Sequence, residues 1–453
     1  MKLSNFRLLA ALVLILGPTC LTAASANWPQ FRGPGSRGVA EGDTLPDRWS
    51  ATENVAWKTE IPGRGWSSPV VWGDRVFLTT VINSGATEEL KKGLYFGGNR
   101  PDPPDAVHQW KVFCLDLQTG RVSWERQVHE GKPQTAIHLK NSFASETPVT
   151  DGARVYCHFG NVGVFAFDLE GNPVWARRLE PHKMRNGWGT AASPVLHGDT
   201  LYLVNDNDED SCLLALDKAT GEQRWRVSRD EKSNWSTPLV WENEQRTEIV
   251  TLGTGAVRSY DLAGKLLWSL EGMSTITIAT PYAHGGLLYF SSGYVGDPFR
   301  PLYAVRPGAR GDISLQEGQQ SNEWIAWCRE KASPYNPSTL VYKDRLYVLY
   351  DRGLFACFDP RDGSDVFGPE RLPNGRAFTA SPWAYDDKVF CLNEDGLTFV
   401  LKAGDEYQLL HTNPLADDDI GMATPAIVGD RLLIRTSARL YCIRSAANPD
   451  RGE

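Results

Sequence analysis

Short segments rich in charged, amide and indole side chains precede a Ser/Thr-Pro dipeptide that recurs along the chain. Guanidinium and ammonium groups attract anions, and indole rings stack on planar groups. Brought to one end of a channel, these side chains would form a binding mouth suited to an anionic or planar ligand. The alternative, which the sequence leaves equally open, is that they only brace the connecting loops. The candidate residues are Arg64, Trp66, Lys140, Asn141, Glu146, Arg185, Trp188, Asn234, Trp235, Asn336, Arg376 and Asp418.

Three aspartates in the segment NDNDEDS resemble the start of a calcium-binding loop. A serine stands where that loop needs a glycine, so the segment is either a loose cation site or a solvated acidic loop. The eight histidines have no metal-ligand spacing, and no spacing singles out a catalytic residue. The weak metal candidates are therefore Asp206, Asp208 and Asp210.

Two alternating sequence elements must position these segments. The first is a Ser/Thr-Pro strand, a tight turn and a second strand, as in ASPVLHGDTLYLVN (192–205). The second is an Asp-turn-Trp strand, as in ALDKATGEQRW (215–225). Each pair supplies four short strands at a period of about 44 residues, the content of one propeller blade. The repeating prolines stand at positions 69, 148, 194, 238, 281, 337, 382 and 425.

Two insertions interrupt this period. The spacing of the prolines grows to 79 residues in the first blade and to 56 in the fifth. We place the extra length in 81–110 and in SSGYVGDPFRP (291–301), on the face of the blade-to-blade crossings, and expect short turns throughout the opposite face. Because 81–110 contains several aromatic residues, we predict an ordered flap that shapes the binding site with Arg64, Arg185 and Trp188.

The sequence thus predicts an all-β fold, an eight-bladed β-propeller with four-stranded antiparallel blades. After 439–445 the chain lacks its last Asp-turn-Trp strand, and Asn54–Gly63 supplies a matching one, so the N-terminal strand should close the last blade. Aromatic residues of the fourth strands should pack between blades and stabilise the fold more than the tryptophans of the channel mouth do. They are Trp57, Trp124, Trp175, Trp225, Trp268, Trp327 and Phe367.

Residues 1–26 have the pattern of a secretory signal peptide, in which Lys2 and Arg7 precede a short apolar run and cleavage is expected after Ala26. This predicts a periplasmic or secreted protein without a transmembrane segment. An N-terminal extension (27–53), the propeller (54–445) and a short tail (446–453) would follow. Without the leader, 45 basic and 55 acidic residues remain, which argues against a nucleic-acid partner. The cysteines inside apolar strands are expected to be buried and unpaired.

The Ser/Thr-Pro strand and the Asp-x-x-Thr-Gly-x-x-x-Trp turn resemble the tryptophan-docking repeat of pyrroloquinoline-quinone (PQQ)-type propellers, over residues 54–445. The chain is most similar to the secreted PQQ-like repeat proteins of planctomycete-type bacteria, and more loosely to the outer-membrane assembly lipoprotein BamB. The resemblance implies a monomeric binding or scaffolding module of the cell envelope with a protein or glycan ligand. The alternative it implies is a PQQ- and calcium-dependent oxidoreductase of alcohols or sugars, whose adjacent-cysteine pair this chain lacks.

Overall fold

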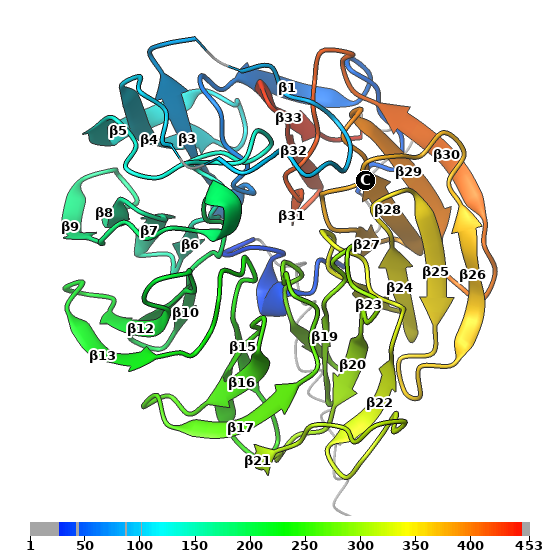
Figure 1. The fold of residues 1–453 in the computed structure, drawn as a ribbon. Helices are drawn as coiled ribbons and strands as arrows, with labels where there is room; N and C mark the ends of the chain where they lie inside the picture. The colour runs from blue at the N-terminus through cyan, green and yellow to red at the C-terminus, as the bar shows by residue number, and fades with distance from the viewer. Residues whose placement is uncertain (1–26, 42–44, 87, 101, 446–453) are drawn as a thin grey trace, which may run out of the picture.

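The computed structural model describes residues 27–41, 45–86, 88–100 and 102–445. The predicted leader (1–26) and tail (446–453) lie outside the described residues. The described chain forms eight β-sheets arranged as blades around a central channel, which confirms the predicted fold (Figure 1). In the first seven blades the strands follow one another in chain order from the channel to the rim. No helix in the described part is long and apolar enough to cross a membrane.

The first four blades are built from the strands between residues 70 and 271, together with a short 3-10 helix, η2 (Arg185–Gly187), in the crossing between the second and third blades. Their strands are β2 (Val70–Trp72), β3 (Arg75–Asn83), β4 (His108–Asp116) and β5 (Val122–Gly131); β6 (Val149–Thr150), β7 (Arg154–Phe159), β8 (Gly163–Asp168) and β9 (Pro173–Arg178); β10 (Val195–His197), β11 (Thr200–Asn205), β12 (Cys212–Asp217) and β13 (Gln223–Ser228); and β14 (Leu239–Glu242), β15 (Thr247–Thr251), β16 (Ala256–Tyr260) and β17 (Leu266–Glu271).

The next three blades and the closing blade complete the ring. Their strands are β18 (Tyr282–His284), β19 (Leu287–Ser291), β20 (Leu302–Val305) and β22 (Ile325–Arg329); β23 (Leu340–Tyr342), β24 (Arg345–Leu349), β25 (Leu354–Phe358) and β26 (Asp365–Arg371); β27 (Trp383–Tyr385), β28 (Lys388–Leu392), β29 (Leu397–Lys402) and β30 (Leu409–Pro414); and β31 (Ala426–Val428), β32 (Arg431–Arg435), β33 (Arg439–Ile443) and β1 (Val55–Glu60).

The N-terminal strand β1 closes the ring as predicted. It pairs antiparallel with β33, with Lys58 opposite Tyr441 and Thr59 opposite Leu440. The eighth blade therefore takes its outer strand from the start of the propeller and its other strands from the end. This arrangement leaves no open sheet edge between the first and last blades, because one blade holds both ends of the ring.

Tryptophans of the outer strands join neighbouring blades. Five indole N–H groups donate to a backbone carbonyl in the third-to-fourth-strand turn of the next blade, at 2.9 to 3.1 Å. A glycine with positive φ lies under each of these rings, and a Cβ added there would approach an atom of the ring or of its neighbours to 3.0 Å or less. The Asp-turn-Gly repeat thus shapes a seat for the preceding blade's indole. The five are Trp57, Trp124, Trp175, Trp225 and Trp327.

The fourth and fifth blades depart from this pattern. Residues 306–324, between β20 and β22, form a long connection that contains β21 (Gly311–Asp312), and β21 adds a fifth, parallel strand to the fourth blade. Part of the extra length of the fifth blade therefore lies on the face where we expected only short turns, and that expectation was wrong. With its neighbouring turn replaced, Trp268 is fully buried and donates instead to Glu248 of its own blade at 2.8 Å.

Two further boundaries differ from the sequence prediction. Strand β3 extends to Asn83 and β4 begins at His108, so the first insertion is 84–107 rather than 81–110. In the sixth blade Ser338 lies two residues before β23, as Ser381 does before β27. Pro337 is therefore two residues out of register with the other repeating prolines. The hydroxyl residue before the strand is the constant feature, and the proline after it is not.

The N-terminal extension crosses the end of the channel on the side of the first-to-second-strand turns. Trp28 forms a bridge with Val71 of β2, and Val39 forms one with Ala384 of β27, which lies six blades further along the chain. Between these contacts lie Arg32, which is fully buried over the Tyr282 ring, and the 3-10 helix η1 (Pro34–Ser36) at the centre of the ring (Figure 1). The extension thus plugs one end of the channel.

Candidate ligand-binding site

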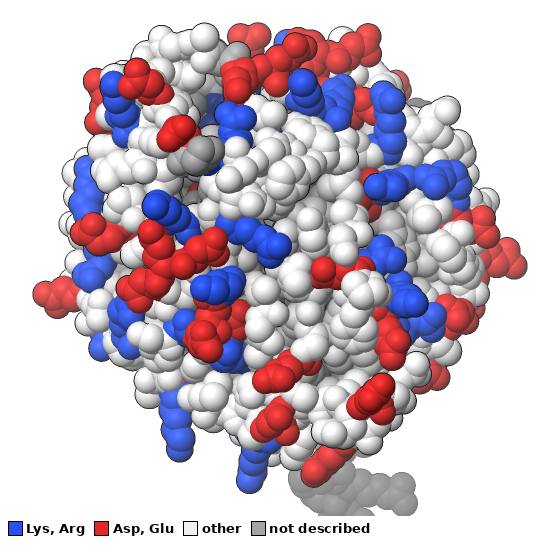
Figure 2. Space-filling view, viewed as in Figure 1, with Lys and Arg blue, Asp and Glu red and all other residues white. Residues whose placement is uncertain are grey.

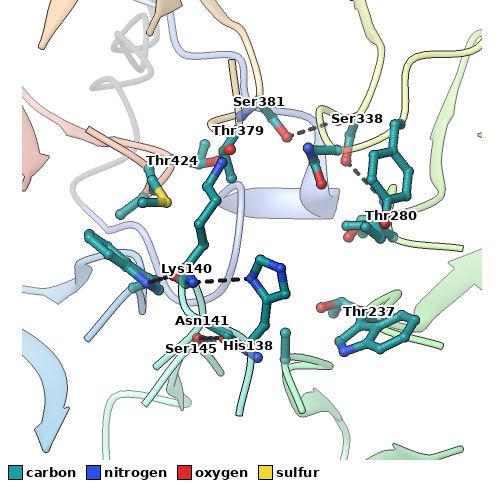
Figure 3. A pocket seen from close by; sticks show the side chains of 18 of the residues that line it. His138, Lys140, Asn141, Ser145, Thr237, Thr280, Ser338, Thr379, Ser381 and Thr424 are labelled. Carbon is teal, nitrogen blue, oxygen red and sulfur yellow. Dashed lines mark hydrogen bonds between the residues drawn. The ribbon is translucent and has the colours of Figure 1, made fainter. Parts of the chain in front are cut away.

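A cavity of about 250 Å³ occupies the channel above this plug (Figure 3). Every one of the eight blade-to-blade crossings contributes to its lining, and Phe31 of the extension also lines it. The structure brings together six of the residues predicted for the channel mouth. These are Trp66, Lys140, Asn141, Trp188, Trp235 and Asn336.

Aromatic rings form much of the wall. The rings of Trp188 and Trp235 lie 6.1 Å apart at 41°, and Trp66 and Tyr335 also line the cavity. Each indole N–H is already bonded to a backbone carbonyl: that of Trp66 to the oxygen of Lys140 at 2.7 Å, and that of Trp235 to the oxygen of Gly189 at 2.6 Å. The indoles are therefore fixed, and they offer the cavity apolar ring surface rather than N–H donors.

These channel tryptophans are more buried than one of the docking tryptophans. Trp188 and Trp235 are 9% and 8% exposed and belong to one apolar cluster, whereas Trp225 is only half-buried. The expectation that the channel tryptophans matter less to stability rested on greater exposure, and in the comparison with Trp225 the structure shows the reverse order of burial. Removing either kind of indole side chain leaves a cavity, so both substitutions should lower the free energy of unfolding substantially.

Hydroxyl groups of the Ser/Thr-Pro repeat form a ring in the cavity (Figure 3). In six blade pairs, the backbone N–H of one such residue donates to the side-chain oxygen of its counterpart in the next blade, at 2.9 to 3.0 Å. This ring of bonds explains why serine or threonine recurs at the position. The members that line the cavity are Thr147, Ser193, Thr237, Thr280, Ser338, Ser381 and Thr424.

The first insertion, 84–107, lies over this cavity as a flap, and Gly93, Leu94 and Tyr95 line the cavity from it. A buried ion pair latches it to the seventh blade. The Lys140 ammonium contacts Glu394 Oε1 at 2.5 Å and donates to the Gly93 carbonyl at 2.9 Å. The Gly93 N–H in turn donates to Glu394 Oε2 at 2.7 Å. One carboxylate thus holds both the lysine and the flap backbone.

The described groups that line the cavity offer no unpaired charge. Its ammonium group, Lys140, is paired with Glu394, whose side chain is only 1% exposed. Burial lowers the pKa of His138 and raises the pKa values of Tyr95 and Tyr335, so all three side chains are neutral near pH 7. A ligand here meets aromatic surface and uncharged hydrogen-bonding groups.

Four of the predicted residues lie outside this cavity, at the surface around it. Arg64 lines a neighbouring cavity of about 320 Å³ and donates to the Glu88 carbonyl at 2.8 Å. Arg185 donates to the Thr275 carbonyl at 2.9 Å. The other two form exposed ion pairs: Arg376 with Asp395, and Asp418 with Arg439.

Two more predicted residues, and the acidic segment, form bonds within the propeller rather than lining the cavity. Glu146 is buried and accepts a hydrogen bond from Thr190 at 2.5 Å. Asn234 donates to Asp206, which also forms a fully buried, two-bond pair with Arg229 at 2.8 and 2.9 Å. The other two aspartates have partners of their own: Asp208 accepts from Ser233, and Asp210 pairs with Arg226.

Sequence reasoning missed several lining residues. Phe31 comes from the extension, which has no repeat to align it with the channel. Tyr95 comes from the flap, whose path across the channel no local pattern indicates. Tyr335 directly precedes the predicted Asn336, and His138 lies two residues before the predicted Lys140, but neither was itself predicted. The ring hydroxyls recur in every blade and were read only as a repeat signature.

The donor set can be tested against the cofactor that the fold suggests. PQQ is a planar quinone with several carboxylates, and its calcium ion would need about six to eight oxygen ligands. The cavity's ammonium group is already bonded to Glu394. Within the described ranges, no group of three His, Cys, Asp or Glu side chains could hold a metal ion, and the seven cysteines there are free and buried. The residues present do not fit PQQ with calcium.

Comparison with known proteins relates the chain to one described family. A sequence model of the family described as outer membrane protein assembly factor BamB matches residues 92–227 and, overlapping them, 160–308. The crystal structure of BamB from Moraxella catarrhalis is similar with a TM-score of 0.53 and 11% identity, over 81% of this chain and 99% of that one. The chain is a PQQ-like β-propeller related to BamB.

Two further solved structures share the fold of this PQQ-like propeller. Quinohemoprotein alcohol dehydrogenase from Comamonas testosteroni has a TM-score of 0.56 and 12% identity, over 94% of this chain and 82% of that one. The computationally designed protein Ika8 has a TM-score of 0.53 and 12% identity, over 90% and 99%. No curated protein matches the sequence. At such low identity these likenesses concern the fold alone, since one propeller fold hosts unrelated functions.

Proposed function

We propose that this PQQ-like propeller is an exported, non-catalytic binding module that holds a small ligand, or the end of a larger one, in the cavity under the flap. The observation that carries the proposal is the convergence of all eight crossings, the flap and the N-terminal plug on one aromatic cavity. Cavities of this kind, apolar with a few convergent polar groups, are the usual form of a ligand site. Export is supported by the leader pattern at residues 1–26.

A binding role suits the contacts within the site. The charged side chains of the latch bond each other, and the indole N–H groups bond backbone carbonyls. Groups engaged in this way position a ligand but are not poised to exchange protons with it. The relation to a family described as an assembly factor also favours binding over chemistry.

Saturation-transfer NMR with the chain from residue 27 tests the proposal against a panel of neutral sugars, charged sugars, short peptides, fatty acids and PQQ with calcium. Ala191→Phe would fill the cavity, because Ala191 lines it. Val295→Phe is the matched control, at a position 44% exposed and outside the cavity lining. We expect one class to bind the wild type and the control but not Ala191→Phe. If no class binds, or if the filled variant binds equally well, the proposal is wrong.

A further inference from the structure

We infer that the ligand of this cavity is an uncharged sugar residue, held with its ring against the indole wall and its oxygens against the hydroxyl ring. The inference rests on the proposed function and names the ligand class. It starts from the side chains of the Ser/Thr ring, which are 1% to 4% exposed and yet line the cavity. Buried polar groups of this kind need partners.

These hydroxyls have protons to donate. Six of the seven hydroxyl oxygens each accept one hydrogen bond from the backbone N–H of the corresponding residue in the preceding blade. Ser381, for example, accepts from the N–H of Ser338 at 2.9 Å. None of the seven donates to an acceptor elsewhere in the described chain. A hydroxyl is both donor and acceptor, so a ring of donor protons faces the cavity and is free for oxygen atoms of a ligand or of water. Sugar hydroxyl and ring oxygens are such acceptors.

The electrostatics favour a neutral ligand over an anion. The cavity's cation is bonded to a carboxylate, and His138 is kept neutral by burial. A carboxylate or phosphate that entered this buried site would lose its hydration without gaining a free cation as a partner, which is unfavourable. Figure 2 shows Lys and Arg side chains interspersed with Asp and Glu side chains on this face, so it presents no extended basic patch to an anion.

The walls and the size suit one sugar ring. Indole faces pack against the C–H surface of a sugar by dispersion and hydrophobic contact, and the fixed rings of Trp188 and Trp235 lie ready for it. A cavity of about 250 Å³ lies just below the range for ligand pockets, which is about 300 to 1,000 Å³. A glycan would therefore insert one terminal residue.

An apolar peptide side chain is the competing ligand, and the hydroxyl ring disfavours it. Such a side chain would displace water from seven buried hydroxyls without offering any acceptor in return. A sugar keeps those bonds while it covers the aromatic wall. The cavity thus matches an amphipathic, uncharged ligand with many oxygens.

The test uses calorimetry and saturation-transfer NMR on the chain from residue 27, with methyl glycosides of neutral hexoses and of N-acetylhexosamines. Glucuronic acid and an apolar tripeptide are the competing probes. Thr280→Val removes one cavity hydroxyl that accepts no backbone N–H in the described chain, so the ring of bonds survives. Ser68→Ala is the matched control, since Ser68 holds the equivalent position in the first blade but lies outside the cavity lining.

We expect a neutral glycoside to bind, Thr280→Val to weaken it roughly five- to tenfold, and Ser68→Ala to leave it unchanged. Both variants should melt like the wild type. If another class binds and Ala191→Phe blocks it while no neutral sugar binds, the sugar inference is overturned and the binding function stands. Preferred binding of glucuronic acid or of the tripeptide overturns it equally. If no probe binds at all, the inference and the proposed function both fall.

Discussion

The carboxyl group of Glu146 keeps its proton to unusually high pH. Burial raises its pKa from 4.5 to about 7, and its Oε2 atom has no partner in the described part of the chain. The folded state therefore binds this proton more tightly than the unfolded state does. The stability that depends on it is complete below about pH 4.5 and is lost as the pH rises through about 7.

Glu146→Gln should remove this pH dependence, because the amide never ionises. We expect the variant's gain in free energy of unfolding over the wild type to be roughly 3 kcal/mol larger at pH 8 than at pH 4. Urea unfolding across this range measures the difference. His158, whose pKa burial lowers to about 4, acts with the opposite sign but is present in both proteins. A difference that does not change with pH would contradict the assignment.

The glycine under a docked indole can be tested against a glycine in open space. A Cβ at Gly171, where φ is +83°, would lie 2.6 Å from the ring of Trp124. Gly198 also has a positive φ, of +55°, but nothing lies within 4 Å of its Cβ position. Gly198→Ala should cost about 1 kcal/mol for backbone strain alone. Gly171→Ala should cost roughly 2–4 kcal/mol, and equal losses in thermal unfolding would remove the packing role of the turn.

At the scale of elements, the flap depends on one latch. Glu394→Gln weakens the bonds to Lys140 and to the Gly93 N–H, so the flap should open more often. We expect amide exchange across 90–98 to rise roughly ten- to a hundredfold. Lys140→Met combined with Glu394→Gln, which leaves no buried charge, should show the same rise.

Asp405→Asn is the matched control for the latch. This substitution removes the ion pair between Asp405 and Arg345, in which the aspartate side chain is 67% exposed. The pair joins the sixth and seventh blades and lies far from the flap in sequence. Exchange in the flap should not change there, because exposed pairs contribute little. A latch variant whose flap exchanges as slowly as in this control would show that other contacts hold the flap.

At the scale of the whole molecule, the extension and β1 have separable roles. Deleting 27–63 removes β1 and opens the eighth blade, so we expect insoluble or molten protein without cooperative melting. Deleting 27–53 removes only the plug. That chain should still melt cooperatively, at a lower temperature, and bind an apolar dye, because Trp28 and Trp49 no longer cover the channel end. Cooperative melting of the longer deletion would contradict ring closure.

The sequence by itself determined the ring. Two local patterns specify the fold, namely a hydroxyl residue before each inner strand and an Asp-turn-Trp at the outer strands. The residues of each pattern bond their counterparts in the adjacent blade. Repetition therefore made blade number and closure readable. The register of Ser338 and the connection at 306–324 escaped because each occurs once, and a repeat gives no information about its own exceptions.

Only the tertiary structure decided which residues meet at the channel. Whether Trp66 and Trp235 face the cavity while Arg376 and Asp418 pair at the surface depends on partners outside the local repeat segment, such as Asp395 and Arg439, which lie 19 and 21 residues further along the chain. Phe31, Tyr95 and Glu394 reach the site from three distant segments that share no pattern. Side-chain partners at such separations follow from the folded path of the backbone, and a local repeat carries no information about them.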